Sequence, residues 1–187
     1  DIIKEYSSFM AYGMTAKQGQ IEESPSERDW LDTKPYQSFG DRKTVISEIR
    51  VLLENGDPVG SLFGGELIKI DMKVYSECVV SKPIIGFSVK DRLGQNVFGG
   101  NTFVHEVNLD AIGVGNHKFQ LSFNFPYLSN GDYVLTLAIA DGCSHDHIQK
   151  HWIHDCFVFR MNNPKIRYQN GDGIVLENNF RFKTVAL

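Results

Sequence analysis

Residues 118–125 carry the most regular pattern in the sequence, Lys118-Phe-Gln-Leu-Ser-Phe-Asn-Phe125. Every second side chain is large and apolar, and the side chains between them are polar. Successive side chains of a β-strand point to opposite faces of its sheet. The alternation therefore predicts a strand with one face on a core and the other face toward solvent or a ligand.

The same period of two recurs before and after this strand, between runs of turn residues. Further strands are expected at 43–54, 66–78, 84–90, 96–98, 133–140, 152–161, 173–176 and 180–185. Eight or nine strands joined by turns, with no long helix among them, predict an all-β fold, an immunoglobulin-like antiparallel β-sandwich.

A second local pattern supports this fold class, Leu128-Ser-Asn-Gly-Asp-Tyr133. Gly131 stands two residues before Tyr133, and Tyr133 opens one of the expected strands. In immunoglobulin-like sandwiches a tyrosine in this setting forms a tyrosine corner, in which the phenol bonds back to the loop backbone. We predict such a corner here, with an ordinary hairpin turn as the alternative.

The N-terminal segment differs from the rest in charge and in pattern. Residues 1–41 carry eight acidic and four basic residues, whereas residues 42–187 carry fifteen of each. Residues 2–14 are mildly amphipathic and predict one short helix, and the stretch after them is polar and broken by two prolines. We expect 1–41 to be a linker or surface arm, with Trp30 and Tyr36 as anchor points, and 42–187 to be the sandwich.

Composition narrows the possible functions. The chain has 187 residues, 42% apolar and 22% charged, which is enough for one good-sized domain or two small ones and excludes wholesale disorder. The net charge of −4 argues against binding to nucleic acid. No apolar run approaches the roughly 20 residues that cross a bilayer, and no secretory signal is visible. The first residue is Asp1 rather than Met, so we expect a piece of a longer protein.

The three cysteines, Cys78, Cys143 and Cys156, are an odd number and include no C-x-x-C spacing. Buried reduced thiols in a cytoplasmic protein are the favoured interpretation, and a single disulfide is the alternative.

Four histidines lie within ten residues, beside two aspartates: His145, His147, His151, His154, Asp146 and Asp155. An H-x-H pair can place two imidazoles on one metal ion, but zinc takes three or four protein ligands. Residues 145–151 are expected to form a loop, where spacing fixes little, and no second group of ligands stands out. We therefore predict a polar loop with exposed histidines and no structural metal.

Motifs of catalysis do not appear. The sequence has no G-x-S-x-G elbow and no G-x-x-x-x-G-K-[ST] loop, so neither a nucleophile nor nucleotide hydrolysis is predicted, and no cofactor is expected. Five acidic residues could still meet in space as the carboxylate pair that glycoside hydrolysis uses: Asp71, Asp91, Glu106, Asp141 and Asp155. They leave a glycan-active enzyme as the least favoured alternative.

The outward faces of the strands at 84–90, 133–140 and 152–161 hold the best candidate site. If their large apolar side chains point inward, small residues form a shallow floor outside: Gly86, Ala138 and Ala140. Trp152 and His154, two apart on one strand, share that face about 7 Å apart and supply a stacking wall. The polar groups that could reach a sugar are those of Ser88, Lys90 and Thr136.

Such a surface is typical of a carbohydrate site, because sugar C–H faces stack on aromatic rings and sugar hydroxyls need many polar partners. Two alternatives stay open. The same face could pack on another subunit or under the N-terminal arm. The other sheet could instead bind a glycan through its outward residues Arg50, Lys73, Tyr75 and Gln120.

Three stretches resemble a known family. The first, Pro83-Ile-Ile-Gly-Phe-Ser-Val-Lys-Asp-Arg-Leu-Gly-Gln-Asn-Val-Phe-Gly-Gly-Asn-Thr102, looks like the hallmark hairpin of the C-terminal domain of Wzt. Wzt is the ATP-binding subunit of ABC transporters that export O-antigen polysaccharide. Gly131-Asp-Tyr-Val-Leu-Thr-Leu-Ala-Ile-Ala-Asp141, and then Trp152 with Phe157-Val-Phe159, are similar to the same family. The likeness covers about residues 42–187.

The resemblance implies an immunoglobulin-like sandwich that binds the O-antigen polysaccharide without catalysing a reaction. It also implies a homodimer, a membrane-spanning transporter subunit as a partner of the full-length protein, and a place at the cytoplasmic face of the bacterial inner membrane. Residues 1–41 would join the sandwich to an ATPase domain absent from this chain. The resemblance supplies no residue-level sugar motif. The alternative is a dimerisation or interaction module without a glycan site.

Residues 171–185 carry one further expectation. Two turn-rich stretches, 162–164 and 170–173, separate this segment from the sandwich. Its side chains are too apolar to be left in water: Ile174, Val175, Leu176, Phe180, Phe182 and Val185. We predict that the segment is exchanged between the two chains of a dimer, with docking on its own chain as the alternative.

Overall fold

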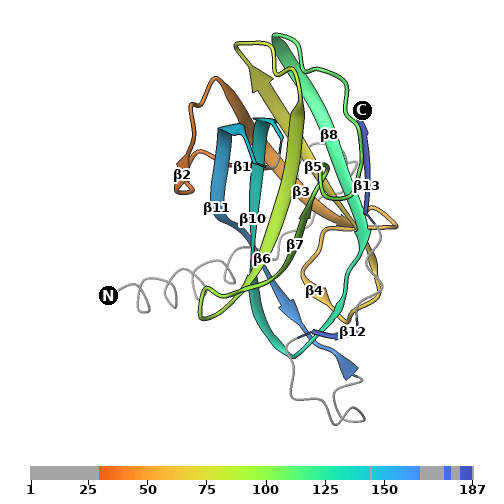
Figure 1. The fold of residues 1–187 in the computed structure, drawn as a ribbon. Helices are drawn as coiled ribbons and strands as arrows, with labels where there is room; N and C mark the ends of the chain where they lie inside the picture. The colour runs from red at the N-terminus through yellow and green to blue at the C-terminus, as the bar shows by residue number, and fades with distance from the viewer. Residues whose placement is uncertain (1–29, 144, 165–174, 178–181, 187) are drawn as a thin grey trace.

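The computed structural model describes residues 30–143, 145–164, 175–177 and 182–186 (Figure 1). The helix expected at 2–14 and most of the expected arm lie outside the described residues. The first described element, β1 (Leu31–Asp32), already belongs to a sheet.

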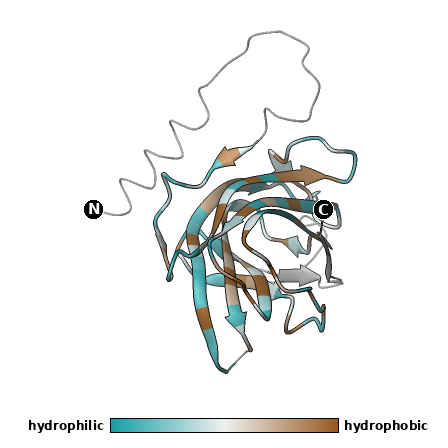
Figure 2. Cartoon of the chain, turned by 90° about the horizontal axis from the view of Figure 1, so that it is seen from above, coloured by the Kyte–Doolittle hydropathy of each residue, from teal (hydrophilic) through white to brown (hydrophobic). Residues whose placement is uncertain are grey.

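The described chain forms two sheets that pack face to face (Figures 1 and 2). The order of the five-stranded sheet is β1, β3 (Thr44–Leu53), β5 (Leu67–Ser76), β8 (Gly115–Asn124) and β13 (Phe182–Ala186). The order of the six-stranded sheet is β2 (Ser38–Phe39), β11 (His147–Met161), β10 (Gly131–Gly142), β6 (Pro83–Asp91) and β7 (Asn96–Asn101), with β4 (Ser61–Leu62) also on β11. A small third sheet pairs β9 (Tyr127–Leu128) with β12 (Val175–Glu177).

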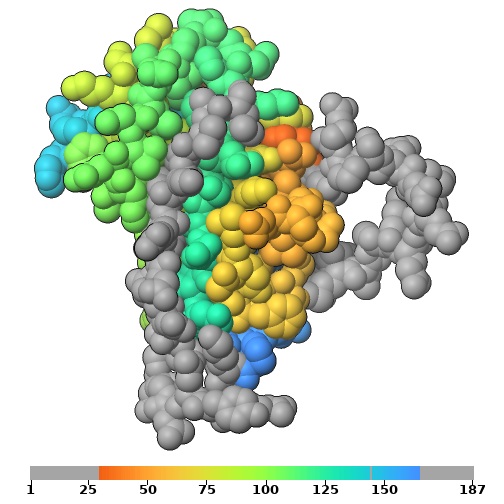
Figure 3. Space-filling model, turned by 90° about the vertical axis from the view of Figure 1, so that its right-hand side faces the viewer, coloured from red at the N-terminus to blue at the C-terminus, as the bar shows by residue number. Residues whose placement is uncertain are grey.

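The predicted all-β antiparallel sandwich is confirmed. Every described strand pair is antiparallel except β4 with the end of β11. The strand predicted from residues 118–125 is β8, whose partner β5 lies beside it in register from Leu67↔Asn124 to Ser76↔Gly115. The green surface of β8 and the yellow surface of β5 adjoin in the space-filling view of Figure 3.

The core lies between the two sheets, where the alternating apolar side chains meet. On β5 the side chains of Ile68, Ile70, Met72 and Val74 are buried, as the alternation predicts. Phe87 of β6 stacks on Phe123 of β8 across the core, with ring centroids 4.4 Å apart and planes at 9°. Each large side chain buried in this way stabilises the fold by about 1.5–3 kcal/mol.

The predicted tyrosine corner is confirmed. Tyr133 at the start of β10 is buried, and its phenol hydroxyl donates a hydrogen bond to the carbonyl oxygen of Ser129 at 2.9 Å. The phenol ring also stacks on Phe159 of β11, with centroids 5.9 Å apart. The corner therefore joins a loop at one end of the sandwich to the core.

Residues 30–42, which we call the strap, run from one sheet to the other. At the start of the strap β1 pairs with β3 of the five-stranded sheet, and near its end β2 pairs with β11 of the six-stranded sheet. Between them, Tyr36 packs against the core. Asp41 and the buried Lys150 form an ion pair at 2.9 Å. This part of the expected arm is thus bound to the sandwich, while the boundary at residue 42 stays a prediction.

The C-terminal segment supplies two described strands. β13 pairs with β8 and extends the five-stranded sheet, and β12 pairs with β9. Residues 171–174 and 178–181 of the segment lie outside the described residues. The pairing is between strands of one chain, and exchange between two chains stays a prediction.

Candidate functional site

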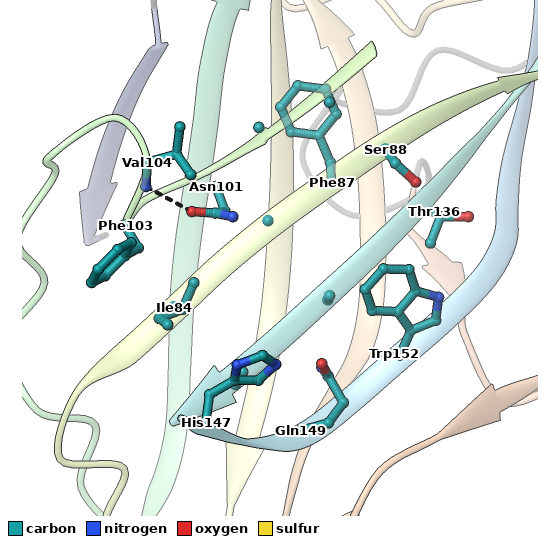
Figure 4. Close-up of a pocket in the computed structure, with 15 residues that line it drawn as sticks. Ile84, Phe87, Ser88, Asn101, Phe103, Val104, Thr136, His147, Gln149 and Trp152 are labelled. Carbon is teal, nitrogen blue, oxygen red and sulfur yellow. Dashed lines mark hydrogen bonds between the residues drawn. The ribbon is translucent and has the colours of Figure 1, made fainter. Parts of the chain in front are cut away.

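A groove of about 360 Å³ lies on the outer face of the six-stranded sheet, the face turned away from the core. Strands β6, β10 and β11 and the chain around β7 all contribute to it (Figure 4). This is the face that the sequence predicts for a carbohydrate site.

The strand register explains why a groove forms here. Four residues face one another across the sheet in a single row, Trp152 on β11, Ala138 on β10, Gly86 on β6 and Asn101 on β7. Since neighbouring strands lie about 4.8 Å apart, the row spans roughly 14 Å. Its outer members carry large side chains and its inner members carry almost none, so the row has raised ends and a low centre.

Gly86 cannot be replaced by a larger residue without movement of the floor. A Cβ atom at this position would lie 2.8 Å from Cβ of Asn101 and 3.1 Å from the carbonyl oxygen of Gly100. Gly99 is equally constrained, because its Cβ would lie 2.5 Å from the carbonyl oxygen of Phe87. The close approach of β6 and β7 therefore depends on glycine, and it gives the floor its low profile.

Three of the five predicted site residues line the groove together: Trp152, Ser88 and Thr136. Thr136 and Ser88 face each other on β10 and β6, in the row next to Ala138 and Gly86. Figure 4 shows the two hydroxyls and the Trp152 indole at one end of the groove. Ala138 and Ala140, which the sequence analysis placed in the floor, line the same groove.

The other two predicted residues lie beside the groove. The His154 ring lies 6.2 Å from the Trp152 ring, on the same strand β11. Lys90 turns its ammonium group to Asp155, with Nζ 3.1 Å from Oδ1. Neither side chain is among the residues that line the groove.

A bulge in β11 explains the position of Asp155. Leu135 of β10 pairs with Phe157 and Leu137 pairs with Ile153, so β11 holds extra residues between these two pairs. Asp155 adopts a left-handed φ of 49°, which is costly for a residue with a side chain. The Asp155 carboxylate accepts hydrogen bonds from Lys90 and, at 3.3 Å, from Thr136.

Two buried polar atoms on groove residues have no hydrogen-bond partner among the described residues, Oγ of Ser88 and Nε1 of Trp152. A buried donor or acceptor without a partner costs about 1–3 kcal/mol. An indole N–H can only donate, whereas a serine hydroxyl can donate or accept. A ligand hydroxyl in the groove could supply the missing partner once the side chain turns the buried atom toward it.

The remaining wall consists of residues that the sequence analysis did not assign to the carbohydrate site. Asn101, Phe103 and Val104 form one side, and His147 and Gln149 line the groove along β11 (Figure 4). Asn101 Oδ1 accepts the backbone N–H of Val104 at 2.8 Å, which turns the chain so that Phe103 and Val104 are exposed beside the floor. The sequence signal that could have found this wall is the pair Gly99-Gly100, since two adjacent glycines in a strand can mark a close approach of another backbone. The alternation of side chains does not show that this pair lies on the same groove as β11.

The lining of the groove is uncharged. Among the described residues that line it there is no Asp, Glu, Lys or Arg, and His147 is its one titratable group. Lys90 and Asp155, on two of the strands that form the groove, are paired with each other.

The alternative site on the five-stranded sheet is occupied by its own ion pairs. Arg50 Nε and Gln120 Nε2 each donate to the buried Asp71 carboxylate at 2.7 Å. Lys73 Nζ bonds to Glu48 at 2.7 Å. Tyr75 is exposed beside them.

The histidines do not form a metal site within the described residues, where no group of three or more His, Cys, Asp or Glu side chains converges. The prediction that 145–151 is a loop is wrong from His147 onward, because β11 already starts there. A bulge at Lys150 breaks the alternation and hides the strand from a period of two. The His151 ring is buried, and its Nδ1 accepts the backbone N–H of Ile46 at 3.1 Å.

The three cysteines are free thiols in the structure, but the expected burial is wrong for Cys78 and Cys143, which are half-buried. Cys156 is fully buried in β11, and burial raises the pKa of its thiol to about 12. Such a thiol is unreactive at neutral pH.

Comparison with known proteins identifies one family. The sequence model of the Wzt C-terminal domain matches residues 36–175. The crystal structure of the C-terminal domain of Wzt superposes with a TM-score of 0.64 at 21% identity, over 87% of this chain and 96% of that chain. No curated protein matches the sequence. At this identity the structural likeness supports the fold, and the match of the family model supports membership. No described helix is long and apolar enough to cross a membrane.

Proposed function

This chain belongs to the Wzt C-terminal domain family, and we propose that it binds the O-antigen polysaccharide, without catalysis, for export by an ABC transporter. The proposal includes a homodimer at the cytoplasmic face of the bacterial inner membrane. It also includes a membrane-spanning transporter subunit that the full-length protein contacts.

One observation carries the proposal. The groove has a floor of small residues, an indole at its edge and two buried polar atoms without described partners, on Ser88 and Trp152. A sugar ring has an apolar face that can stack on indole and hydroxyls that can pair with such atoms. The volume of about 360 Å³ lies within the usual range for small-ligand sites.

The uncharged lining favours a neutral sugar unit in the groove. A phosphate or carboxylate group would lose its hydration there, and no described lysine or arginine lines the groove to replace it. Neutral hydroxyls need only the hydrogen-bond partners that the groove offers. We therefore propose that the unit held in the groove carries no charge.

The test measures binding of the O-polysaccharide isolated from the source strain by calorimetry. Ala138 lies in the middle of the floor, with Gly86 and Trp152 as its neighbours across the sheet. Ala138→Leu fills the groove and should weaken binding about a hundredfold or more, while Ala138→Ser keeps the floor low and should bind within about threefold of the unchanged protein.

Two outcomes would contradict the proposal. Absence of binding by the unchanged protein would remove the function, and equal binding by the two Ala138 variants would remove the groove as its site.

A neutral unit also predicts that the affinity barely changes between 50 mM and 500 mM salt, because screening acts on charges. An affinity that falls steeply with salt would show that a charged unit is bound.

A further inference from the structure

Trp152 lies between the groove and a second surface, which is formed by aromatic rings. Phe39 of β2 lies directly opposite Trp152 of β11 in the strand register. Their rings are stacked, with centroids 5.8 Å apart and planes at 22°. The Phe39 ring also lies 5.7 Å from His154. Phe39, Trp152 and His154 thus form one cluster, which we call the aromatic ledge.

The ledge continues the groove across Trp152. In the six-stranded sheet β2 lies on one side of β11, and β10 with the groove floor lies on the other. Trp152 belongs to both surfaces, since it lines the groove and stacks on Phe39. Phe39 is 50% exposed, so much of its ring is open to a ligand.

The backbone under Phe39 is held firmly, so the ring has a defined place. The carbonyl oxygen of Gln37 accepts the backbone N–H of His154 at 2.9 Å. Arg42 donates to the carbonyl oxygen of Ser38 at 2.8 Å. Gly40 passes so close to β11 that a Cβ there would lie 2.4 Å from the carbonyl oxygen of Lys150. A site needs such support, because a loosely held ring gives little affinity.

We propose that the aromatic ledge is a second sugar subsite, so that the protein binds two consecutive units of the polysaccharide, one in the groove and the next on Phe39 and His154. This inference rests on the proposed function. A chain of sugars can follow the path because Trp152 adjoins both subsites. The ring of Phe39 contributes an apolar stacking surface, and His154 contributes a nitrogen that can bond to a hydroxyl.

The proposal gives the strap a role in binding. Phe39 lies on the strap, which the family resemblance places between the sandwich and the chain before it. A polysaccharide on the ledge would contact that segment directly. It would therefore favour the strap in the position seen here over any position in which Phe39 leaves β11.

The experiment compares two variants of the 187-residue chain, with the O-polysaccharide of the source strain as the probe. Phe39→Leu keeps an apolar side chain on β2 but removes the ring, and Phe39→Tyr keeps the ring. We expect Phe39→Leu to weaken binding about fivefold to tenfold and Phe39→Tyr to bind within about twofold of the unchanged protein. Thermal unfolding of both variants serves as the control for the fold.

A second measurement separates contact with the ligand from support of Trp152. The protein has two tryptophans, so Trp30→Phe leaves Trp152 as the one indole reporter. In this background, saturating polysaccharide should protect Trp152 from acrylamide quenching to the same extent with Leu or Tyr at position 39. Protection that disappears with Leu at saturation would show that Phe39 only holds Trp152 in place, and would overturn the second subsite.

The outcomes distinguish this inference from the function on which it rests. If Phe39→Leu binds like the unchanged protein while Ala138→Leu does not bind, the groove stands and the second subsite is wrong. Equally weak binding by Phe39→Leu and Phe39→Tyr would also overturn it, because the stacking ring would then be irrelevant. If Ala138→Leu binds normally, the groove itself is not the site.

Discussion

The outer faces of the two sheets differ in how their polar groups are bonded. On the five-stranded sheet, Asp71 accepts bonds from Arg50 and Gln120, and Lys73 pairs with Glu48. On the six-stranded sheet, small residues leave a groove, and Ser88 Oγ and Trp152 Nε1 have no partner in the described part of the chain. One face satisfies its own polar groups, and the other leaves such groups for something else to satisfy.

The volume of a surface depression does not distinguish the two faces. A depression of about 460 Å³ on the five-stranded side is larger than the groove. Four of its polar side chains are already bonded, since Ser47 Oγ donates to the carbonyl oxygen of Lys73, Lys73 pairs with Glu48, and the His117 ring bonds to the carbonyl oxygen of Gly113. A ligand in that depression would have to replace existing bonds, whereas a ligand in the groove would add new ones.

We expect the largest effect from removal of the C-terminal segment, because its strand β13 forms one edge of the five-stranded sheet. β13 pairs with β8, and without it β8 becomes an open edge. If the C-terminal segment is exchanged between chains, a chain that ends at Lys165 loses the interface and should be monomeric, whereas the 187-residue chain should be dimeric. Light scattering during size-exclusion chromatography measures both masses. A truncated chain that remains fully dimeric would contradict strand exchange.

The second prediction concerns stability against pH and a hydrogen bond between the two sheets inside the sandwich. His151 of β11 is 6% exposed and accepts the N–H of Ile46 on β3. Burial, aided by the charge of Arg42, lowers the pKa of His151 from 6.5 to about 4. The unfolded chain therefore binds the proton more readily between pH 6.5 and pH 4, and stability should fall as the pH is lowered through this window. The expected loss from this group is about 3 kcal/mol in total.

His151→Asn tests this pH dependence, because an amide oxygen can accept the same N–H but does not titrate. Urea unfolding at pH 7 and pH 4.5 gives the free energy of unfolding of both proteins. The asparagine variant should start less stable, since the side chain is smaller, but should lose about 2–3 kcal/mol less between the two pH values. An equal loss in both proteins would mean that other groups cause the acid sensitivity.

Trp152→Ala tests the six-stranded face by removing its stacking surface. Truncation of a central aromatic residue typically costs about 2 kcal/mol or more, so the affinity for the O-polysaccharide should fall about thirtyfold. Light scattering and circular dichroism should show an unchanged dimer and fold. A variant that loses its dimer before its affinity would show instead that Trp152 is covered by a partner subunit.

Strand positions and the shared face of the candidate site followed from the sequence, because a period of two depends only on backbone geometry. Residues 118–125 became the centre of β8, and Ser88, Thr136 and Trp152 came together although they lie on three strands. Their common face needed no knowledge of the turns between them. Each was an odd number of positions from a residue on the same strand whose side chain had to be buried.

The residues that sequence reasoning missed are those that depend on extra residues within strands or on contacts between distant loops. The β11 bulge turns Asp155 toward Lys90 and removes Lys90 from the groove, and no local pattern announces a bulge of this kind. Phe103 and Val104 reach the floor because Asn101 turns the chain after β7. Asp71 is buried on the outward face since Arg50 and Gln120 cover it.

We expect the smallest effect from replacement of the other tryptophan, Trp30. This variant also gives the clearest contrast between the two faces. The Trp30 ring on the strap lies beside the cations of Arg50 and Lys73, 4.6 and 4.5 Å from its centroid. Cation–π contacts at exposed sites contribute about 0.5–1 kcal/mol each. Arg50 and Lys73 keep their carboxylate partners when the ring is removed. Trp30→Ala should therefore destabilise the protein by about 1 kcal/mol and leave the affinity for polysaccharide unchanged.

Urea unfolding and calorimetry on Trp30→Ala and Trp152→Ala, side by side, separate the roles of the two sheets. Trp30 belongs to the strap and contacts Arg50 of the five-stranded sheet, whereas Trp152 belongs to the six-stranded sheet and stacks on Phe39 of the strap. If the five-stranded face only stabilises, its variant loses stability and not affinity, and the six-stranded variant loses affinity. A Trp30→Ala protein that binds about thirtyfold more weakly at unchanged stability would reverse this assignment, because the ion-paired face with Arg50 and Lys73 would then hold the polysaccharide.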